Sequence, residues 1–218
     1  MYKIPLIILI IGFLLGYTIN ELLVKRKRRN KASELYSLGY RKYKEKEYYE
    51  ALALLNEANG ASPHYETFNI LGHIYDELKE YCKAASSFDD ARRLAWKSNL
   101  QYIAYAYYRS SFSHSKNGNW EFSYERANSG LGLIEVGEIP RYMDDIDMEE
   151  KLRAIRMVAA LHHLQCTESM DLADKDASWI LENSKNEIEL GIAKGVVGLK
   201  FCSKDILNNI TNDFFNLE

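Results

Sequence analysis

A pattern of apolar and small residues occurs twice in this chain, with a constant separation of 33 residues. The first copy contains Leu35, Leu38, Gly39, Tyr48, Ala51, Leu55, Ala58 and Pro63, and the second contains Phe68, Leu71, Gly72, Tyr81, Ala84, Phe88, Ala91 and Trp96. A fixed period in this range is typical of repeat proteins, whose units cannot bury their apolar faces alone and therefore stack. The repeat restricts the chain to a stack of similar units.

The spacing within each copy predicts a pair of helices. Leu35, Leu38 and Gly39 follow one another at steps of three and one, and the apolar positions of Ala51–Ala58 follow at steps of four and three. Both spacings place the residues on one face of an amphipathic helix. Small residues such as Gly39 would let the two helices approach closely, while Leu55 fills the remaining space. Each copy is therefore predicted to be a helical hairpin.

The order of a large apolar residue, Leu-Gly, Tyr and then Ala-x-x-x-Leu/Phe-x-x-Ala resembles the tetratricopeptide repeat. Tyr75 supplies a further aromatic residue expected in the second copy. The resemblance implies an all-α, right-handed solenoid of helical hairpins that binds protein partners and is not an enzyme. The alternative is chance agreement between two ordinary amphipathic hairpins.

The rest of the chain continues the same pattern in a more divergent form. A third copy is indicated by Tyr107, Gly118, Asn119, Trp120, Ser123, Ala127 and Gly130. A break is expected from Gly137 to Asp147, and the acidic residues at its end would either begin a helix or form a docking patch for a basic partner. Beyond it we expect a degenerate fourth hairpin and capping helices, with no sheet. The predicted domains are residues 1–31, 32–140 and 141–218.

The N-terminal segment is predicted to cross a membrane. Residues 4–20 carry no charge, and residues 4–24 would span about 31 Å as a helix, close to one hydrocarbon core. Basic residues follow at Lys25, Arg26, Lys27, Arg28, Arg29 and Lys31, against only Lys3 in front. This asymmetry predicts a single-pass protein with its N-terminus outside and its body in the cytoplasm, with the bacterial inner membrane as the expected location. A signal peptide and a buried core helix are the alternatives.

Two glycines in that segment, Gly12 and Gly16, form a small-xxx-small pair. Such a pair would allow another transmembrane helix to pack closely, although glycine is also common in membrane helices without that role. Residues 1–31 have a net charge of +6 and the remaining chain has −9, from 21 basic and 30 acidic residues. The body is acidic, so nucleic acid is not expected as a partner, because phosphate binding needs clustered Lys and Arg.

The resemblance implies that the first helices of successive hairpins line a concave groove for a partner segment. The residues placed there are Tyr36, Tyr40, Tyr43, Asn69, His73, Asp76, Tyr105, Tyr108, Arg109 and Phe112. Tyrosine offers a rigid apolar face with one hydroxyl, which suits a protein-binding surface, but about half of these tyrosines could instead pack between helices. Tyr36 and Tyr40 replace polar groove residues with which relatives grip chaperone peptides, so that ligand is not expected.

The sequence offers little catalytic chemistry. Cys82, Cys166 and Cys202 are widely spaced, which suits reduced thiols, and the cluster of His162, His163 and Cys166 could supply at most part of a metal site. No metal and no cofactor are predicted. A metal-dependent hydrolase is the weakest of the three functional alternatives.

The layout of an N-terminal anchor, a basic stop and a repeat body is similar to that of the bacterial lipopolysaccharide-assembly adaptor of the B type, without its four-cysteine knuckle. Receptor subunits of the mitochondrial outer membrane share the layout. The sequence therefore predicts a membrane-tethered adaptor that binds a protein partner through a Tyr-rich groove and the bilayer through residues 4–24. The alternative is a fixed structural or assembly subunit of a membrane complex.

Overall fold

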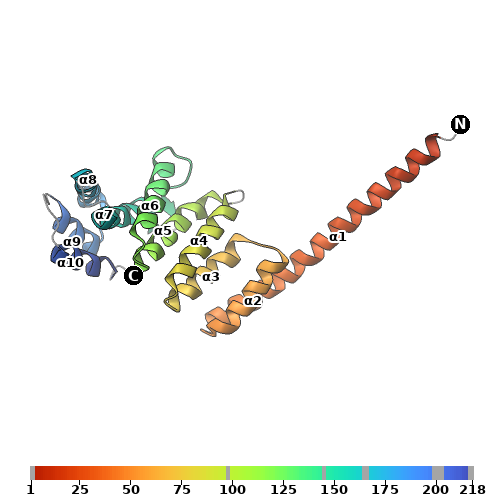
Figure 1. Ribbon diagram of the computed structural model, residues 1–218, viewed down its shortest axis with the longest axis horizontal. Coiled ribbons are helices and arrows are strands. Elements are labelled where there is room, and N and C mark those ends of the chain that lie inside the picture. The colour runs from red at the N-terminus through yellow and green to blue at the C-terminus, as the bar shows by residue number, and fades with distance from the viewer. Residues whose placement is uncertain (1–2, 97–98, 144–145, 164–166, 198–203, 216–218) are drawn as a thin grey trace. The chain divides into compact units, whose positions relative to one another are not determined.

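A computed structural model describes residues 3–96, 99–143, 146–163, 167–197 and 204–215. The chain divides into two compact units, Met1–Thr67 and Phe68–Glu218. Figure 1 shows that helices make up almost all of the described chain. The packing of these helices into hairpins is consistent with a tetratricopeptide-like solenoid, and the handedness and the domain boundaries expected from the sequence remain predictions.

The first unit contains α1 (Lys3–Lys44) and α2 (Tyr48–Ala61), which pack together as a hairpin. A methyl group added at Gly39 would lie 2.8 Å from Cγ of Leu55, which is fully buried. The predicted close approach of the two helices at Gly39 is thus confirmed. The boundary expected at residue 31 falls inside α1, next to Ala32, which is buried.

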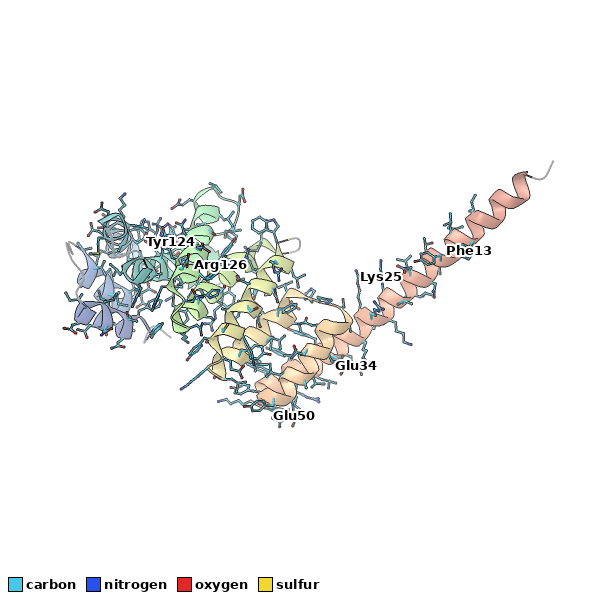
Figure 2. The ribbon with its side chains drawn as sticks, viewed as in Figure 1. Phe13, Lys25, Glu34, Glu50, Tyr124 and Arg126 are labelled. Carbon is cyan, nitrogen blue, oxygen red and sulfur yellow. The ribbon has the colours of Figure 1, made fainter. Side chains whose placement is uncertain are left out.

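The N-terminal half of α1 extends away from α2 within this unit. Figure 2 shows the side chains of Phe13 and Lys25 projecting from it. Its apolar side chains are exposed, including Phe13 at 77% and Leu22 at 65%. Within the part of the chain that the structure describes, no helix combines the length and the apolar character needed to cross a membrane. The side chains of residues 1–10 and 12, which include much of the predicted membrane segment and Gly12, lie outside the described residues.

The second unit continues the hairpins. α3 (Tyr65–Glu77) enters it from the first unit and is followed by α4 (Tyr81–Ala95), α5 (Leu100–Lys116), α6 (Trp120–Glu135), α7 (Met148–His163), α8 (Thr167–Asn183), α9 (Glu187–Val196) and α10 (Lys204–Phe215). Helices α4 and α5, α6 and α7, and α8 and α9 pack together, and α5 also contacts α7. Helices α5 and α7, the first helices of two successive hairpins, therefore lie side by side, as a repeat stack requires.

Small residues mark the contacts within this stack, as the sequence predicts. A methyl group added at Gly72 would lie 2.7 Å from Cε1 of the buried Phe88, the counterpart of Gly39 and Leu55. In the third hairpin, a methyl group at Gly130 would lie 2.9 Å from Leu152 and 3.0 Å from Cβ of Tyr107. The third copy is therefore a packed hairpin of the same kind.

The hairpin turns repeat as well. Lys46 and Lys79, again 33 residues apart, both have φ of 60°, and Gly118 has φ of 71° in the third turn. In each turn the next amide donates to a carbonyl five residues earlier, as in Glu47 N to Lys42 O at 2.9 Å and Glu80 N to Tyr75 O at 2.8 Å. This is a helix C-terminus of the Schellman type, which satisfies carbonyls that the helix leaves unpaired.

The expectation of no sheet is wrong. Tyr142–Met143 (β1) and Ile146–Asp147 (β2) form a short antiparallel pair in the loop between α6 and α7. The pair is held from outside by Arg141, whose carbonyl accepts from Met148 N at 2.8 Å and whose Nη2 donates to Asp147 at 2.8 Å. Two residues per strand are too few to show the period-two alternation that identifies a strand in sequence.

Candidate functional site

The first group of predicted binding residues lies on α1. The rings of Tyr36 and Tyr40 stack with centroids 6.2 Å apart, and Tyr43 continues the row at 6.3 Å from Tyr40. Lys44 Nζ lies 5.3 Å from the centre of the Tyr40 ring, within range of a cation–π interaction. Tyr36 and Tyr43 are half-buried and Tyr40 is exposed. We call Tyr36, Tyr40 and Tyr43 the α1 tyrosine row.

A pocket of about 410 Å³ opens beside this row in the first unit. It is lined by Arg29, Ala32, Ser33, Tyr36, Ser62, Pro63, His64, Glu66 and Thr67. Burial and the nearby Glu66 carboxylate raise the pKa of Tyr36 to about 12. The Tyr36 hydroxyl therefore stays protonated at neutral pH and can donate a hydrogen bond to a ligand in the pocket.

The second group lies on α3 and α5, inside the second unit. Nε2 of His73 lies 3.1 Å from the hydroxyl of Tyr105, and the His73 ring packs edge-on against Phe88. Arg109 Nη2 donates to Asp76 Oδ2 at 2.7 Å. These pairs join two successive first helices. His73, Asp76, Tyr105, Tyr108 and Arg109 are only partly buried, and we call this set the α3–α5 face.

Aromatic contacts continue along α5 from that face. The ring centroids of Tyr105 and Tyr108 are 6.2 Å apart, and those of Tyr108 and Phe112 are 6.1 Å apart. The guanidinium of Arg109 lies 5.8 Å from the Tyr108 ring. Asn69, the remaining predicted residue, is half-buried on α3. The structure thus brings together those predicted residues that lie on α3 and α5. The predicted residues of the α1 tyrosine row belong to the first unit.

Phe112 differs from the other predicted residues because the chain itself covers it. Its side chain is only 2% exposed, and its ring lies 5.4 Å from that of Phe214 and 6.2 Å from that of Phe215. Both phenylalanines belong to α10. The prediction missed this contact because residues so far apart in sequence give no local signal, although the apolar spacing of α10 does mark it as an amphipathic helix.

The side chain of His162, considered in the sequence as part of a metal site, packs against other side chains. Its imidazole lies flat on the Trp120 indole with centroids 3.8 Å apart, and its Nε2 lies 2.7 Å from the Thr211 hydroxyl of α10. Cys166 and the side chain of His163 lie outside the described residues. Among the side chains that the structure does describe, no group of three His, Cys, Asp or Glu residues is placed to hold a metal ion.

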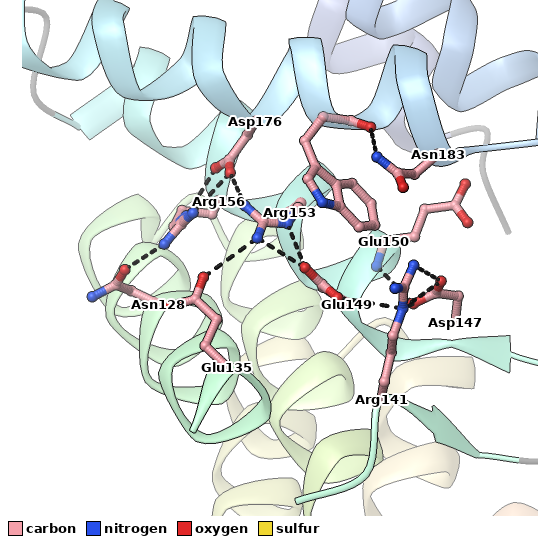
Figure 3. Close-up of polar contacts among 11 residues, drawn as sticks. Asn128, Glu135, Arg141, Asp147, Glu149, Glu150, Arg153, Arg156, Asp176 and Asn183 are labelled. Atoms are coloured by element: carbon pink, nitrogen blue, oxygen red, sulfur yellow. Dashed lines mark hydrogen bonds and ion pairs between the residues drawn. The ribbon is translucent and has the colours of Figure 1, made fainter. Parts of the chain in front are cut away.

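Buried ion pairs join several helices of the second unit. Figure 3 shows Arg153 and Arg156 of α7 converging on Asp176 of α8, and Arg156 also donating to Asn128 of α6. Arg153 further reaches Glu149 at 2.8 Å. This network connects three successive helices through charge-assisted hydrogen bonds, which are stronger than neutral ones. No sequence pattern predicted it.

A second network lies between α4 and the third hairpin. The guanidinium of Arg126 donates to both oxygens of Asp89, at 2.9 Å each, and the Ser110 hydroxyl donates to Oδ1 at 2.9 Å. Burial alone would raise the pKa of Asp89, but the neighbouring His114, Arg126 and Ser110 hold it well below its usual value. Asp89 is therefore ionised and fixes α5 and α6 to α4.

Comparison with known proteins finds similarity among solved structures. No protein-family model matches the chain, and no curated protein matches it. Among solved structures, the chain is similar to the N-terminal domain of stress-induced protein-1 (STI-1) from C. elegans. The identity is 17% and the TM-score 0.49, over 59% of this chain and 96% of that chain. A likeness of this size is too low to transfer any function.

Proposed function

We propose that the protein is a membrane-tethered adaptor that holds a segment of a protein partner against the α3–α5 face. The observation that carries the proposal is the joining of two successive first helices by Tyr105–His73 and Arg109–Asp76, with the aromatic rings left half-exposed. Rigid tyrosines beside an ordered charged pair are well suited to bind a peptide, since little side-chain entropy remains to be lost. The repeat spacing in the sequence supports the same role.

The tether is argued from the sequence of residues 4–24 and from α1. The described apolar side chains between residues 11 and 24 are exposed, so no other described segment covers them. Exposed apolar rows of this size need a partner or a membrane. The basic residues that follow would stop the segment at anionic headgroups. Lipid is the proposed environment of the N-terminal half of α1.

A continuous α1 gives the tether a mechanical role. Because Lys3–Lys44 is one helix, the membrane segment would pass without a linker into the first hairpin. The body would then be held close to the membrane, where the effective concentration of a membrane partner is high. A modest affinity of the α3–α5 face would be enough to recruit that partner.

Affinity purification with quantitative mass spectrometry tests this function. The tagged full-length protein is extracted in detergent, and the wild type is compared with Tyr105→Ala/Tyr108→Ala. The double variant should lose the specific partner, while Tyr49→Ala, at an exposed tyrosine of α2, should retain it. Full recovery of the same partner by the double variant, with unchanged helix content, would refute binding at this face.

A fixed subunit of a membrane complex is the second candidate. It is favoured by Gly16, beside which there is open space on α1 for a closely packed helix. In that case Gly16→Ile should release the protein from its complex, whereas Tyr105→Ala/Tyr108→Ala should not.

A further inference from the structure

The C-terminal helix α10 lies on the side of the stack formed by first helices. It contacts α9 and α7, and its two phenylalanines reach Phe112 of α5. Helices α5, α7 and α9 are the first helices of successive hairpins. In the resemblance drawn from the sequence, this is the side that receives a partner segment.

The docked face of α10 has the pattern of an amphipathic helix. Leu207, Ile210 and Phe214 are buried at spacings of three and four, and Asn208, Asn209, Asn212 and Asp213 are exposed on the opposite face. An isolated helix of 12 residues is only marginally stable in water, so α10 depends on this contact for its structure. The arrangement is that of a short helix bound in a hydrophobic surface.

Specific contacts fix α10 in place. The Thr211 hydroxyl meets His162 Nε2 at 2.7 Å, and the Phe215 ring lies 6.1 Å from the Trp120 indole that stacks on His162. On α5, Lys116 Nζ lies 4.7 Å from the centre of the Phe112 ring and 3.6 Å from Asp76 Oδ1. The contacts of Thr211 and Phe215 are ones that another helix could also make.

The surface under α10 is continuous with the α3–α5 face. Phe112 lies one helical turn beyond Tyr108 on α5, and the centroids of their rings are 6.1 Å apart. A helix that bound along α5 over Tyr105 and Tyr108 would therefore meet Phe214 and Phe215 where they cover Phe112. The two helices would compete for the same end of α5.

We propose that α10 is an internal ligand of the partner-binding surface, and that the partner is an amphipathic helix with an aromatic anchor that displaces it. This proposal rests on the proposed function for the existence of a partner. The binding preference itself, for a helix with apolar residues at the spacing of Leu207, Ile210 and Phe214, does not.

A labelled peptide with the sequence of residues 204–215 tests that preference without any knowledge of the partner. Binding to full-length protein in detergent is followed by fluorescence anisotropy. The attached α10 competes at an effective concentration near the millimolar range, so the wild type should bind the peptide weakly. Phe214→Ala in the chain should loosen α10 and tighten peptide binding at least ~10-fold, since the site becomes free for a larger fraction of the time.

Two controls make the result specific. Asn212→Ala, on the exposed face of α10, should bind the peptide as weakly as the wild type, and a peptide carrying Phe214→Ala should bind neither chain. Equal, weak binding of the unmodified peptide to the wild-type and Phe214→Ala chains, with helix content retained, would overturn the proposal. This outcome leaves the purification test of partner binding unaffected, so the two ideas fail separately.

Hydrogen exchange on the wild-type chain decides the matter even if Phe214→Ala does not fold. A displaceable α10 should open more often than the stack beneath it, so its amides should exchange faster than the buried amides of α7. Protection of α10 equal to that of α7 would show a fixed structural cap and would overturn the proposal.

Discussion

The carboxylate of Asp176, fully buried on α8, accepts hydrogen bonds from Nε and Nη2 of Arg156 at 2.8 and 2.7 Å. Arg153 donates to the same carboxylate at 3.0 Å (Figure 3). Two cations of α7 therefore share one anion of α8. A buried pair of this kind contributes little net stability over an apolar core, but the loss of one partner leaves buried charge uncompensated.

Asp176→Asn should therefore be strongly destabilising. The amide keeps the shape of the side chain but removes the charge that both arginines face, and we expect a loss of ~3 to 5 kcal/mol in the free energy of unfolding. Urea unfolding followed by circular dichroism measures it. Asp171→Asn, at an exposed position of the same helix, should change stability by less than ~0.5 kcal/mol. Equal stability of the two variants would contradict the structural role of Asp176.

The close contact of Gly72 with Phe88 makes a second prediction. An added methyl group would lie within 2.9 Å of three ring atoms of a fully buried side chain, so Gly72→Ala should cost ~1 to 3 kcal/mol by overpacking. Gly132→Ala on α6 has open space around it and should be neutral or stabilising by up to ~1 kcal/mol, because alanine favours the helix. Thermal unfolding of both variants tests the difference. If both substitutions changed the stability in the same direction, Gly72 would not be a position of close helix packing.

The repeat and its hairpins could be predicted because small residues at a constant spacing record helix contacts directly. Gly39 with Leu55 and Gly72 with Phe88 are examples, since both members of each pair lie within one 33-residue unit. The left-handed Lys46 and Lys79 could not be predicted, because lysine rarely adopts that conformation and turn propensities point to glycine or asparagine.

The arrangement of the candidate site could be predicted only in part, for a related reason. Residues of α3 and α5 such as His73 and Tyr105 meet because the period repeats the same helix face. The cover over Phe112 comes from Phe214, about a hundred residues later and beyond the clear repeats. A contact between a repeat helix and a helix outside the clear repeats produces no regular spacing in the sequence. For this reason α10 was expected only as a cap.

His162 should make the stability of the second unit depend on pH. Burial lowers the pKa of His162 to about 4 from an ordinary value of 6.5, so the unfolded chain binds a proton more readily between these values. The free energy of unfolding should therefore fall as the pH falls from 6.5 toward 4. The groups described around the ring are Trp120 and Thr211, neither of which carries a charge.

Urea unfolding of the wild type and of His162→Gln between pH 7 and pH 4 isolates this contribution. Glutamine can still bond to Thr211 but takes up no proton, so the variant should lose less stability on acidification. Identical pH dependence of the two proteins would mean that folding does not change the pKa of His162, and would contradict its burial.

The last prediction concerns the proposed membrane segment. Leu14 is the central residue of the segment 4–24 and its side chain is 56% exposed on α1, so in a bilayer it would face the middle of the hydrocarbon core. An arginine there costs ~2.5 to 3.5 kcal/mol of insertion free energy. Leu14→Arg should therefore shift the protein from the carbonate-resistant membrane fraction to the supernatant. Tyr49→Arg, at the exposed Tyr49 of α2, should not. Protease added to the outside of intact cells should leave the body of the wild type uncut, since the basic residues from Lys25 to Lys31 favour a cytoplasmic position. Release of the wild type by carbonate would exclude a membrane-spanning segment. Digestion of the body by the external protease would show that the orientation is opposite to the one predicted.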